Sequence, residues 1–421
     1  MYIFELDKKL IENIISLATI KGLQYLLAFI TFPYLVRVLQ VEQYGLIVFA
    51  QSIVQYFVLL TDYGFNLLGP REIAQHDSVQ ERGAVFSNIF FAKVLLLFFS
   101  TILFVCGLFG LGEYGEVDIV LYLTFYLMVI GNVLFPVWFF QGIQQMRYIT
   151  LVNIIANVFR VAGIFLLVKT PQDYLIAALF QAIVPLIASI FSWIILAKDY
   201  PEVFVLPSSQ GIKKMFVDGW SIFTSTISIN LYTASNIVFL GVLTNNVVVG
   251  YFSGAKKIID NITQLISPIT QAIYPYVSKK ASASKTDALR FLHKIVVLLG
   301  GGNFLLSIFI ITFADYIVKL LLGNGYEQSI LLLRIMAFLP VIISLSNIFG
   351  IQTMLVFGMQ KTFSKILFMS AVLNTCIVLP LICFFEGVGV GISITVTECF
   401  VTIAMWYVLR SNGINLLRRQ L

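Results

Sequence analysis

Charged side chains inside apolar runs are the residues of this sequence that could do chemistry. The segment GYFSGAKKIIDNITQ carries Lys256, Lys257 and Asp260. Lys256 and Asp260 are four residues apart, so on a helix they can form a neutralising pair. Because two lysines accompany one aspartate, the segment keeps a surplus positive charge. Such a surplus suits an anionic ligand: a carboxylate, a phosphate or a pyrophosphate.

Other apolar runs also carry ionisable residues. At the depth of a bilayer such groups are costly, and each is a functional-site hypothesis. Two acids, Asp260 and Glu398, could titrate and bind a proton or a sodium ion. The basic residues are candidates for the lining of a cationic cavity: Lys21, Arg160, Lys256, Lys257 and Arg334.

A structural interpretation of the same charges stays open at this point. The lysines of the 250–264 segment could serve only to neutralise Asp260 within their own helix. Lys93 and Arg334 could extend to water, and Asp62 lies near a helix end where a polar side chain can reach the surface. Pairing and surface exposure of this kind would leave no ligand site.

The composition places these charges in a membrane protein. Of 421 residues, 59% are hydrophobic and 11% are charged, whereas soluble domains have about 45–50% apolar and about 25% charged residues. A soluble chain of this length could not bury so large an apolar fraction. The N-terminal segment lacks a short apolar core followed by a small-residue cleavage site, so no removed signal peptide is expected.

A spanning helix needs about 20 mostly apolar residues, and this length predicts an all-α bundle of about twelve transmembrane helices. Two runs, 248–277 and 329–357, are long enough to be tilted or kinked. Seven prolines fall inside predicted spans, where each tends to kink its helix. The predicted spans are 14–38, 43–63, 88–110, 118–141, 149–168, 174–197, 219–243, 248–277, 295–314, 329–357, 363–385 and 388–409.

Lysine and arginine residues set the expected orientation. With the N-terminus inside, the cytoplasmic connections carry 18 of them and the opposite connections carry 3, a strong bias under the positive-inside rule. Both termini are therefore predicted to be cytoplasmic. Topology accounts for most of the net charge of +6, so no nucleic-acid partner is inferred.

The longest polar interval suggests two lobes. Residues 198–218 contain two prolines and a Ser-Ser-Gln-Gly stretch after the sixth predicted span. This interval predicts a cytoplasmic linker between an N-terminal six-helix lobe, 1–197, and a C-terminal six-helix lobe, 219–421. Six-plus-six repeats are common among secondary transporters, which bind their substrates between the two halves.

No enzyme constellation is present in the sequence. The four cysteines and two histidines have no metal-type spacing, and neither a Walker sequence nor a G-x-S-x-G motif occurs. An ATP-driven pump within this chain is excluded. We expect a secondary transporter without a metal or cofactor, apart from coupling to H⁺ or Na⁺.

Four segments of the chain have a recognisable pattern: ITFPYLVRVLQVEQYG (30–45), TDYGFNLLGPREIA (61–74), VWFFQGIQQMRYIT (137–150) and GYFSGAKKI…PITQAIYP (250–275). They resemble one family, the Wzx-type O-antigen and polysaccharide flippases. Its superfamily includes the MATE multidrug exporters and the lipid II flippase. The similarity extends in order along most of the chain, although beyond about residue 290 only the spacing matches.

The resemblance implies two six-helix lobes in a V shape that open alternately to either side of a bacterial inner membrane. It implies movement of undecaprenyl-pyrophosphate-linked oligosaccharide, the O-antigen repeat unit of lipopolysaccharide, from the inner to the outer leaflet. A central cationic cavity would receive the pyrophosphate. On matching positions this assigns Lys21, Lys256 and Lys257 to the cavity. Membrane lipids, a polysaccharide polymerase and chain-length proteins are the implied partners.

The second resembling segment, DYGFNLLGPRE, supplies candidates for a cytoplasmic gate. Asp62, Arg71 and Glu72 lie where the two lobes of such a protein would meet. This assignment depends on the resemblance.

Three other functions remain to be distinguished. A multidrug or metabolite exporter of the same architecture would want acidic cavity residues for cationic drugs, whereas basic ones prevail here. A membrane polymerase or ligase of the sugar pathway should show a large outer loop with catalytic Arg or His, and the predicted connection 315–328 has neither. A passive channel is the third.

Overall fold

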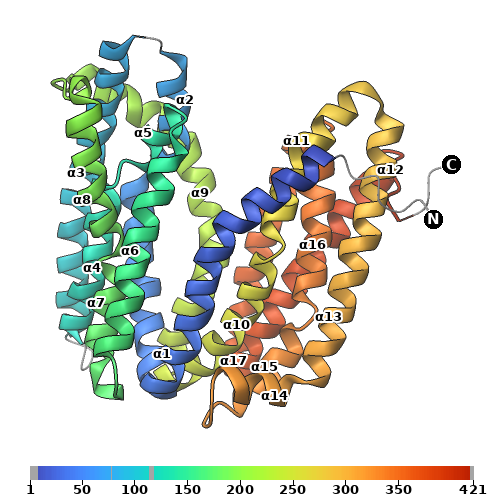
Figure 1. The fold of residues 1–421 in the computed structure, drawn as a ribbon. Coiled ribbons are helices and arrows are strands. Elements are labelled where there is room, and N and C mark those ends of the chain that lie inside the picture. The colour runs from blue at the N-terminus through green and yellow to red at the C-terminus, as the bar shows by residue number, and fades with distance from the viewer. Residues whose placement is uncertain (1–7, 77, 113–117, 418–421) are drawn as a thin grey trace. The chain divides into compact units, whose positions relative to one another are not determined.

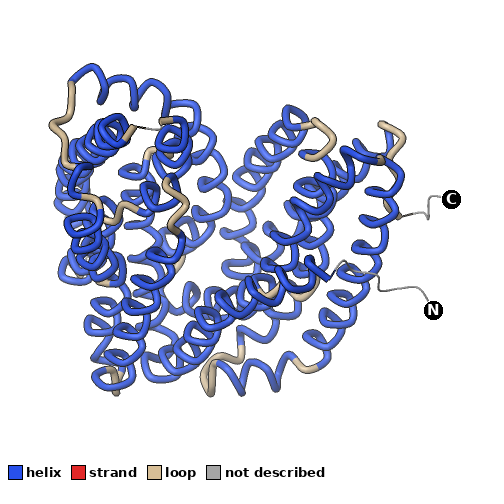
Figure 2. The backbone as a smooth tube through the Cα atoms, turned by 45° about the horizontal axis from the view of Figure 1, so that its top comes forward, coloured by secondary structure: helices blue, strands red, loops and turns tan. Residues whose placement is uncertain are grey.

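The computed structural model describes residues 8–76, 78–112 and 118–417, and every regular element in these ranges is helical (Figure 2). The predicted all-α architecture is therefore confirmed. Within these ranges the side chains at 8–26, 28, 111–112, 225, 228–229, 231–234, 267–268, 271–272 and 275 are not described.

Two helices in the first half of the chain, α1 and α3, are much longer than a bilayer requires (Figure 1). In chain order, the elements of this half are α1 (Lys8–Asp62), α2 (Phe65–Gln75), α3 (Val79–Gly112), α4 (Ile119–Leu134), α5 (Val137–Gly142), α6 (Met146–Leu167), the 3₁₀ turn η1 (Pro171–Asp173), α7 (Tyr174–Ala182) and α8 (Val184–Asp199).

The helices of the second half include two π-helical turns, η3 and η4. In chain order, the elements of this half are the 3₁₀ turn η2 (Pro201–Val203), α9 (Ser209–Leu243), α10 (Asn246–Gln264), α11 (Ser267–Ala283), α12 (Lys285–Ile295), η3 (Val296–Gly300), α13 (Gly301–Thr312), α14 (Ala314–Leu321), α15 (Gln328–Met336), α16 (Leu339–Phe349), η4 (Gly350–Leu355) and α17 (Gln360–Ser411).

The longest helices each contain a sharp turn. The backbone of α1 leaves helical geometry at Gln40 (φ 60°, ψ 178°), and that of α17 does so at Glu386 (φ 47°, ψ −126°). In α17 a Cβ atom on Gly389 would overlap the carbonyl oxygen of Leu381, so the chain folds back there. Eight helical stretches in the described ranges are long and apolar enough to cross a membrane. Because the two turned helices each hold two predicted spans, these stretches account for ten of the predicted spans. The other two predicted spans, 219–243 and 248–277, fall on α9 and on α10 with α11, so about twelve spans fit the helices.

Prolines mark the breaks inside several spans, as the sequence predicts. Pro136 separates α4 from α5, and Pro185 lies at the start of α8 directly after α7. Pro268 lies at the start of α11 and Pro340 at the start of α16. The two unusually long apolar runs, 248–277 and 329–357, are therefore each divided into two helices. Because proline lacks a backbone N–H, a helix can start at it without losing a bond.

The described chain forms two compact units. One unit combines 1–45 with 235–421, and the other holds 46–234. The chain passes from one unit to the other within α1 and again within α9. These limits differ from the lobes expected from the sequence, because the first 45 residues group with the C-terminal part. The lobe boundaries at 197 and 219 stay a prediction.

The interval expected to be a linker is largely ordered against α3. Only 200–208 lies outside α8 and α9, and it includes the η2 turn. The Ser208 backbone N–H donates to Asn88 Oδ1 at 2.9 Å, and Val203 is buried. A Cβ atom on Gly83 would come within 2.9 Å of the Val205 side chain. This segment is therefore a packed part of the 46–234 unit rather than a free tether.

Each unit has an aromatic or aliphatic core and an apolar exterior. Phe65, Phe86 and Trp138 are among the fully buried side chains of the 46–234 unit. On the outside of α3, Phe98 is 70% exposed and Phe109 is 76% exposed. Large exposed aromatic residues on a long apolar helix are typical of a surface that faces lipid.

Close helix contact within the 1–45 and 235–421 unit depends on glycine. A Cβ atom on Gly45 of α1 would overlap the Asn246 carbonyl oxygen of α10.

We expect Gly45→Ala to lower the melting temperature of the purified protein, because overpacking costs about 1–3 kcal/mol. Gly107→Ala is the matched control, since nothing lies within 4 Å of its added Cβ. Equal melting temperatures for the two variants would contradict this packing.

Candidate functional site

A cluster of three charged side chains lies in the unit formed by 1–45 and 235–421. Lys256 of α10 forms an ion pair with Asp260 one turn later, and both side chains are half-buried. Lys256 is also within electrostatic range of the Glu398 carboxylate on α17. The approach of α10 to α17 is seen where Gly387 packs beside Val248. Lys256 is thus the cation shared by two acids.

The remaining predicted cavity cations have different surroundings. Lys257 is exposed, and Arg334 pairs with Asp315 at 2.5 Å in an exposed position. Arg160 belongs to the other unit, where its Nε is buried without a hydrogen-bond partner among the described residues. The side chain of Lys21 lies outside the described residues. Of the predicted site, the structure brings together Lys256, Asp260 and Glu398, and the shared cavity of five cations stays a prediction.

A second charged pair lies in the 46–234 unit. Lys93 of α3 is 2% exposed and its Nζ lies 3.6 Å from the Asp62 carboxylate at the end of α1. The same ammonium donates to the Asn132 carbonyl oxygen at 3.3 Å. The pair borders a polar cavity of about 240 Å³ that Gln55 and Asn66 also line. The sequence-based expectation that Lys93 extends to water is therefore wrong.

The three predicted gate residues do not pair with one another in the described contacts. Asp62 is engaged with Lys93, whereas Glu72 of α2 lies 3.9 Å from Lys214 of α9. Arg71 is exposed. All these residues belong to the 46–234 unit, and their role as a gate stays a prediction.

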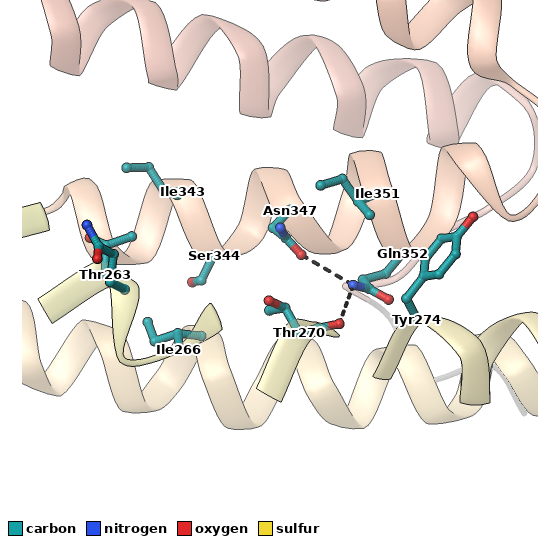
Figure 3. Close-up of a pocket in the computed structure, with 10 residues that line it drawn as sticks. Thr263, Ile266, Thr270, Tyr274, Ile343, Ser344, Asn347, Ile351 and Gln352 are labelled. Atoms are coloured by element: carbon teal, nitrogen blue, oxygen red, sulfur yellow. Dashed lines mark hydrogen bonds between the residues drawn. The ribbon is translucent and has the colours of Figure 1, made fainter. Parts of the chain in front are cut away.

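One further pocket was not predicted from the sequence, because the residues that line it are uncharged. It occupies about 500 Å³ between α10–α11 and α16–η4 (Figure 3). Asn347 and Gln352 line one side, and Thr263, Thr270 and Tyr274 line the other. The available signal was two amide side chains five residues apart in the apolar run 329–357.

An apolar pocket lies on another face of α10. It has a volume of about 470 Å³ and is lined by Ile258 and Leu265 together with Phe32, Phe309 and Ile310. The stretch 256–274 therefore borders a charged cluster, an uncharged polar pocket and an apolar pocket. This combination matches the parts of an amphiphile rather than those of a compact soluble substrate.

Comparison with solved structures shows the class of fold. An inward-facing multidrug resistance MATE family transporter of the MOP superfamily aligns with TM-score 0.71 and 13% identity, covering 93% of this chain and 98% of that one. The inward closed conformation of the lipid II flippase MurJ aligns with TM-score 0.69 and 12% identity, covering 94% and 87%. The chain is a multi-pass membrane protein with this fold.

Sequence comparison shows the family. Residues 10–281 match the family described as "Polysaccharide biosynthesis protein". An Escherichia coli (strain K12) protein named for O-antigen transport is 33% identical over 404 residues, which cover 95% of this chain and 97% of that protein. A Shigella dysenteriae protein of the same name is 29% identical over 399 residues, covering 94% and 98%.

The chain therefore belongs to the polysaccharide biosynthesis protein family, with relatives named as O-antigen transporters. The resemblance to O-antigen flippases that the sequence indicates is confirmed. The family and its relatives named for O-antigen transport make the chain a transporter rather than an enzyme.

Proposed function

We propose that this protein moves an undecaprenyl-pyrophosphate-linked oligosaccharide from the inner to the outer leaflet of the bacterial cytoplasmic membrane by alternating access. The observation that carries the proposal is the surroundings of the 256–274 stretch. There the ion pair of Lys256 and Asp260, an uncharged polar pocket and an apolar pocket adjoin the consecutive helices α10 and α11. Full-length kinship with proteins named for O-antigen transport supports the same substrate class.

The physical task of such a protein concerns the polar head. A pyrophosphate with sugars cannot enter hydrocarbon without a large desolvation cost, whereas the polyprenyl tail is stable there. Lys256 can lower this cost by direct pairing with a diphosphate oxygen. To do so it must leave Asp260, so substrate and carboxylate compete for one ammonium.

This competition offers a route to ion coupling. If a proton or Na⁺ neutralises Asp260 or Glu398, Lys256 loses a competing partner and becomes free to bind a diphosphate. Binding of the ion would then raise the affinity for the substrate, and binding of the substrate would raise the affinity for the ion by the same factor. Coupling of transport to a proton or to Na⁺ is therefore part of the proposal.

A multidrug exporter is the second candidate, and one observation favours it. The described cluster holds two carboxylates for one lysine, and a surplus of acid suits an organic cation. The two candidates differ in phenotype. A flippase restores a surface glycan, whereas an exporter raises resistance to cationic dyes.

Complementation tests the proposal. The gene is expressed in a strain that synthesises the cognate glycan but lacks its flippase, and surface glycan and membrane abundance are measured together. We expect restored surface glycan without a change in dye resistance. A protein that reaches the membrane at normal abundance, restores no glycan and raises dye resistance would support the exporter instead.

We also propose an inner-membrane location with both termini in the cytoplasm. Fusions to a reporter that is active only in the periplasm should be active at positions 112, 171, 245 and 387. They should be silent at 78, 208, 285 and 415. A reversed or odd pattern would contradict the twelve-span topology. Interaction with a polysaccharide polymerase and chain-length proteins stays a prediction.

A further inference from the structure

The uncharged pocket has a chemistry that the diphosphate and the lipid tail do not explain. Its described lining residues supply hydroxyls, carboxamides and one phenol ring beside three isoleucine side chains, and none of them is charged. The polar members are Thr263, Gln264, Thr270, Ser344, Asn347 and Gln352. Groups of this kind both donate and accept hydrogen bonds, as the hydroxyls of a sugar do.

Gln352 is the most informative member of the lining because its side chain is 1% exposed. Its Nε2 donates to the Thr270 carbonyl oxygen at 2.9 Å and to Asn347 Oδ1 at 3.4 Å (Figure 3). Its Oε1 is buried and accepts no hydrogen bond from the described residues. A buried acceptor without a donor is costly, so this carboxamide favours a ligand that brings a donor.

The backbone at Gln352 is also unusual. Gly350–Leu355 form the π-helical turn η4, and the Thr353 hydroxyl donates five residues back to the Ile348 carbonyl oxygen. A π-turn inserts one residue into a helix and shifts the face on which the next side chains lie, and such turns occur often at functional sites. Here the shifted stretch places Gln352 against the carbonyl of Thr270 on α11.

Tyr274 adds a partly exposed ring to the pocket. The side chain is 39% exposed, and the pocket that it lines also holds amides and hydroxyls. An aromatic face packs against the C–H groups of a sugar ring, and the phenol oxygen can bond a hydroxyl. Polar groups beside one exposed ring are suited to a sugar.

Other occupants fit less well. A diphosphate would need a lysine or arginine, and an organic cation would need a carboxylate, but the described lining holds neither. A polyprenyl tail would leave the amides unpaired, and the apolar pocket lined by Ile258 and Leu265 suits it better. Thr263 lies two helical turns beyond Lys256 on α10, about 10 Å along the axis.

We propose that this pocket is a subsite for the neutral sugar residues next to the diphosphate of the transported lipid. The inference rests on the proposed function and adds to it the chemical group that is recognised and the residues that recognise it. Asn347, Gln352 and Tyr274 bind sugar hydroxyls and a ring face, whereas Lys256 binds the diphosphate.

Binding to two lipids tests the subsite. The purified full-length protein in detergent is titrated with undecaprenyl pyrophosphate that carries a neutral trisaccharide, and separately with bare undecaprenyl pyrophosphate. We expect the wild type to prefer the glycan-bearing lipid about tenfold or more, because several hydrogen bonds are added. In Asn347→Leu and Tyr274→Leu this preference should fall to about twofold or less, while the affinity for the bare lipid is retained.

Controls separate recognition from folding. Ser346 lies beside Asn347 on α16 but outside the pocket lining. The variant Ser346→Ala should therefore keep the wild-type preference for the glycan-bearing lipid. Because Asn347→Leu could misfold, the milder Tyr274→Phe, which removes only the phenol oxygen, serves as a second variant, and melting temperatures are measured for all.

The outcomes distinguish the subsite from the proposed function. Binding of both lipids by folded variants with an unchanged preference would overturn the subsite and leave the flippase proposal intact. Equal binding of both lipids by the wild type would also overturn the subsite. A folded wild-type protein that binds neither lipid would overturn the proposed function itself.

Discussion

Removing the Asp62 carboxylate alone is expected to destabilise the protein more than removing it together with the Lys93 ammonium. Lys93 is 2% exposed, and its Nζ lies 3.6 Å from the Asp62 carboxylate. Asp62→Leu would leave a buried ammonium without its charge partner, and breaking a buried ion pair in this way costs about 3–5 kcal/mol. The double variant Asp62→Leu, Lys93→Met removes both charges and should recover most of that loss.

The pair Glu72 and Lys214 provides a matched control in the same unit. These side chains lie 3.9 Å apart, but that of Lys214 is 62% exposed, and exposed pairs contribute about 0–1 kcal/mol. Melting temperatures in detergent should therefore show strong coupling for Asp62 and Lys93 and weak coupling for Glu72 and Lys214. Additive effects of the two substitutions at Asp62 and Lys93 would contradict a buried pair.

Substitutions of Lys256 are expected to have the largest effect on transport. Lys256→Arg should keep part of the activity, because the charge is retained although the compact ammonium becomes a planar fork. Lys256→Ala should lower transport about tenfold or more, since a charge-assisted bond to the diphosphate is lost. Lys256→Glu should be the most severe, because it gathers a third carboxylate beside Asp260 and Glu398.

The neighbouring lysine gives this experiment its sharpest comparison. Lys257 is exposed, whereas Lys256 is half-buried in its pair with Asp260, so Lys257→Ala should lose less activity than Lys256→Ala. Lys361→Ala, at the exposed start of α17, controls for a general change in charge. Surface glycan is measured with membrane abundance in parallel. Full transport by an abundant Lys256→Ala variant would contradict the assigned role.

The helical architecture could be predicted because the length of apolar runs and the positions of prolines are local properties. The breaks before α11 and α16 follow directly from Pro268 and Pro340. The grouping of 1–45 with the C-terminal part could not be predicted in this way. It depends on contacts between distant residues, such as the Arg37 side chain donating to the Leu320 carbonyl oxygen and Tyr326 donating to Val36 at 3.4 Å.

The site was predicted only where the relevant partners lie on one helix. The spacing of Lys256 and Asp260 indicates their pair, whereas the approach of Glu398 on α17 has no sequence signal. Burial of Lys93 depends on Asp62, 31 positions earlier, so helix position alone suggested a water-exposed side chain. The uncharged pocket could not be predicted, because amides such as Asn347 and Gln352 carry no charge and are common in transmembrane helices.

Transport by the purified protein in liposomes is the most direct test of the central claim. The liposomes contain undecaprenyl-pyrophosphate-linked oligosaccharide, and a membrane-impermeant glycosidase reports the fraction of glycan in the outer leaflet over time. We expect the wild type to bring inner-leaflet glycan to the outer leaflet much faster than liposomes without protein or with Lys256→Glu. A folded, correctly inserted wild-type protein that exposes glycan no faster than empty liposomes would contradict the account.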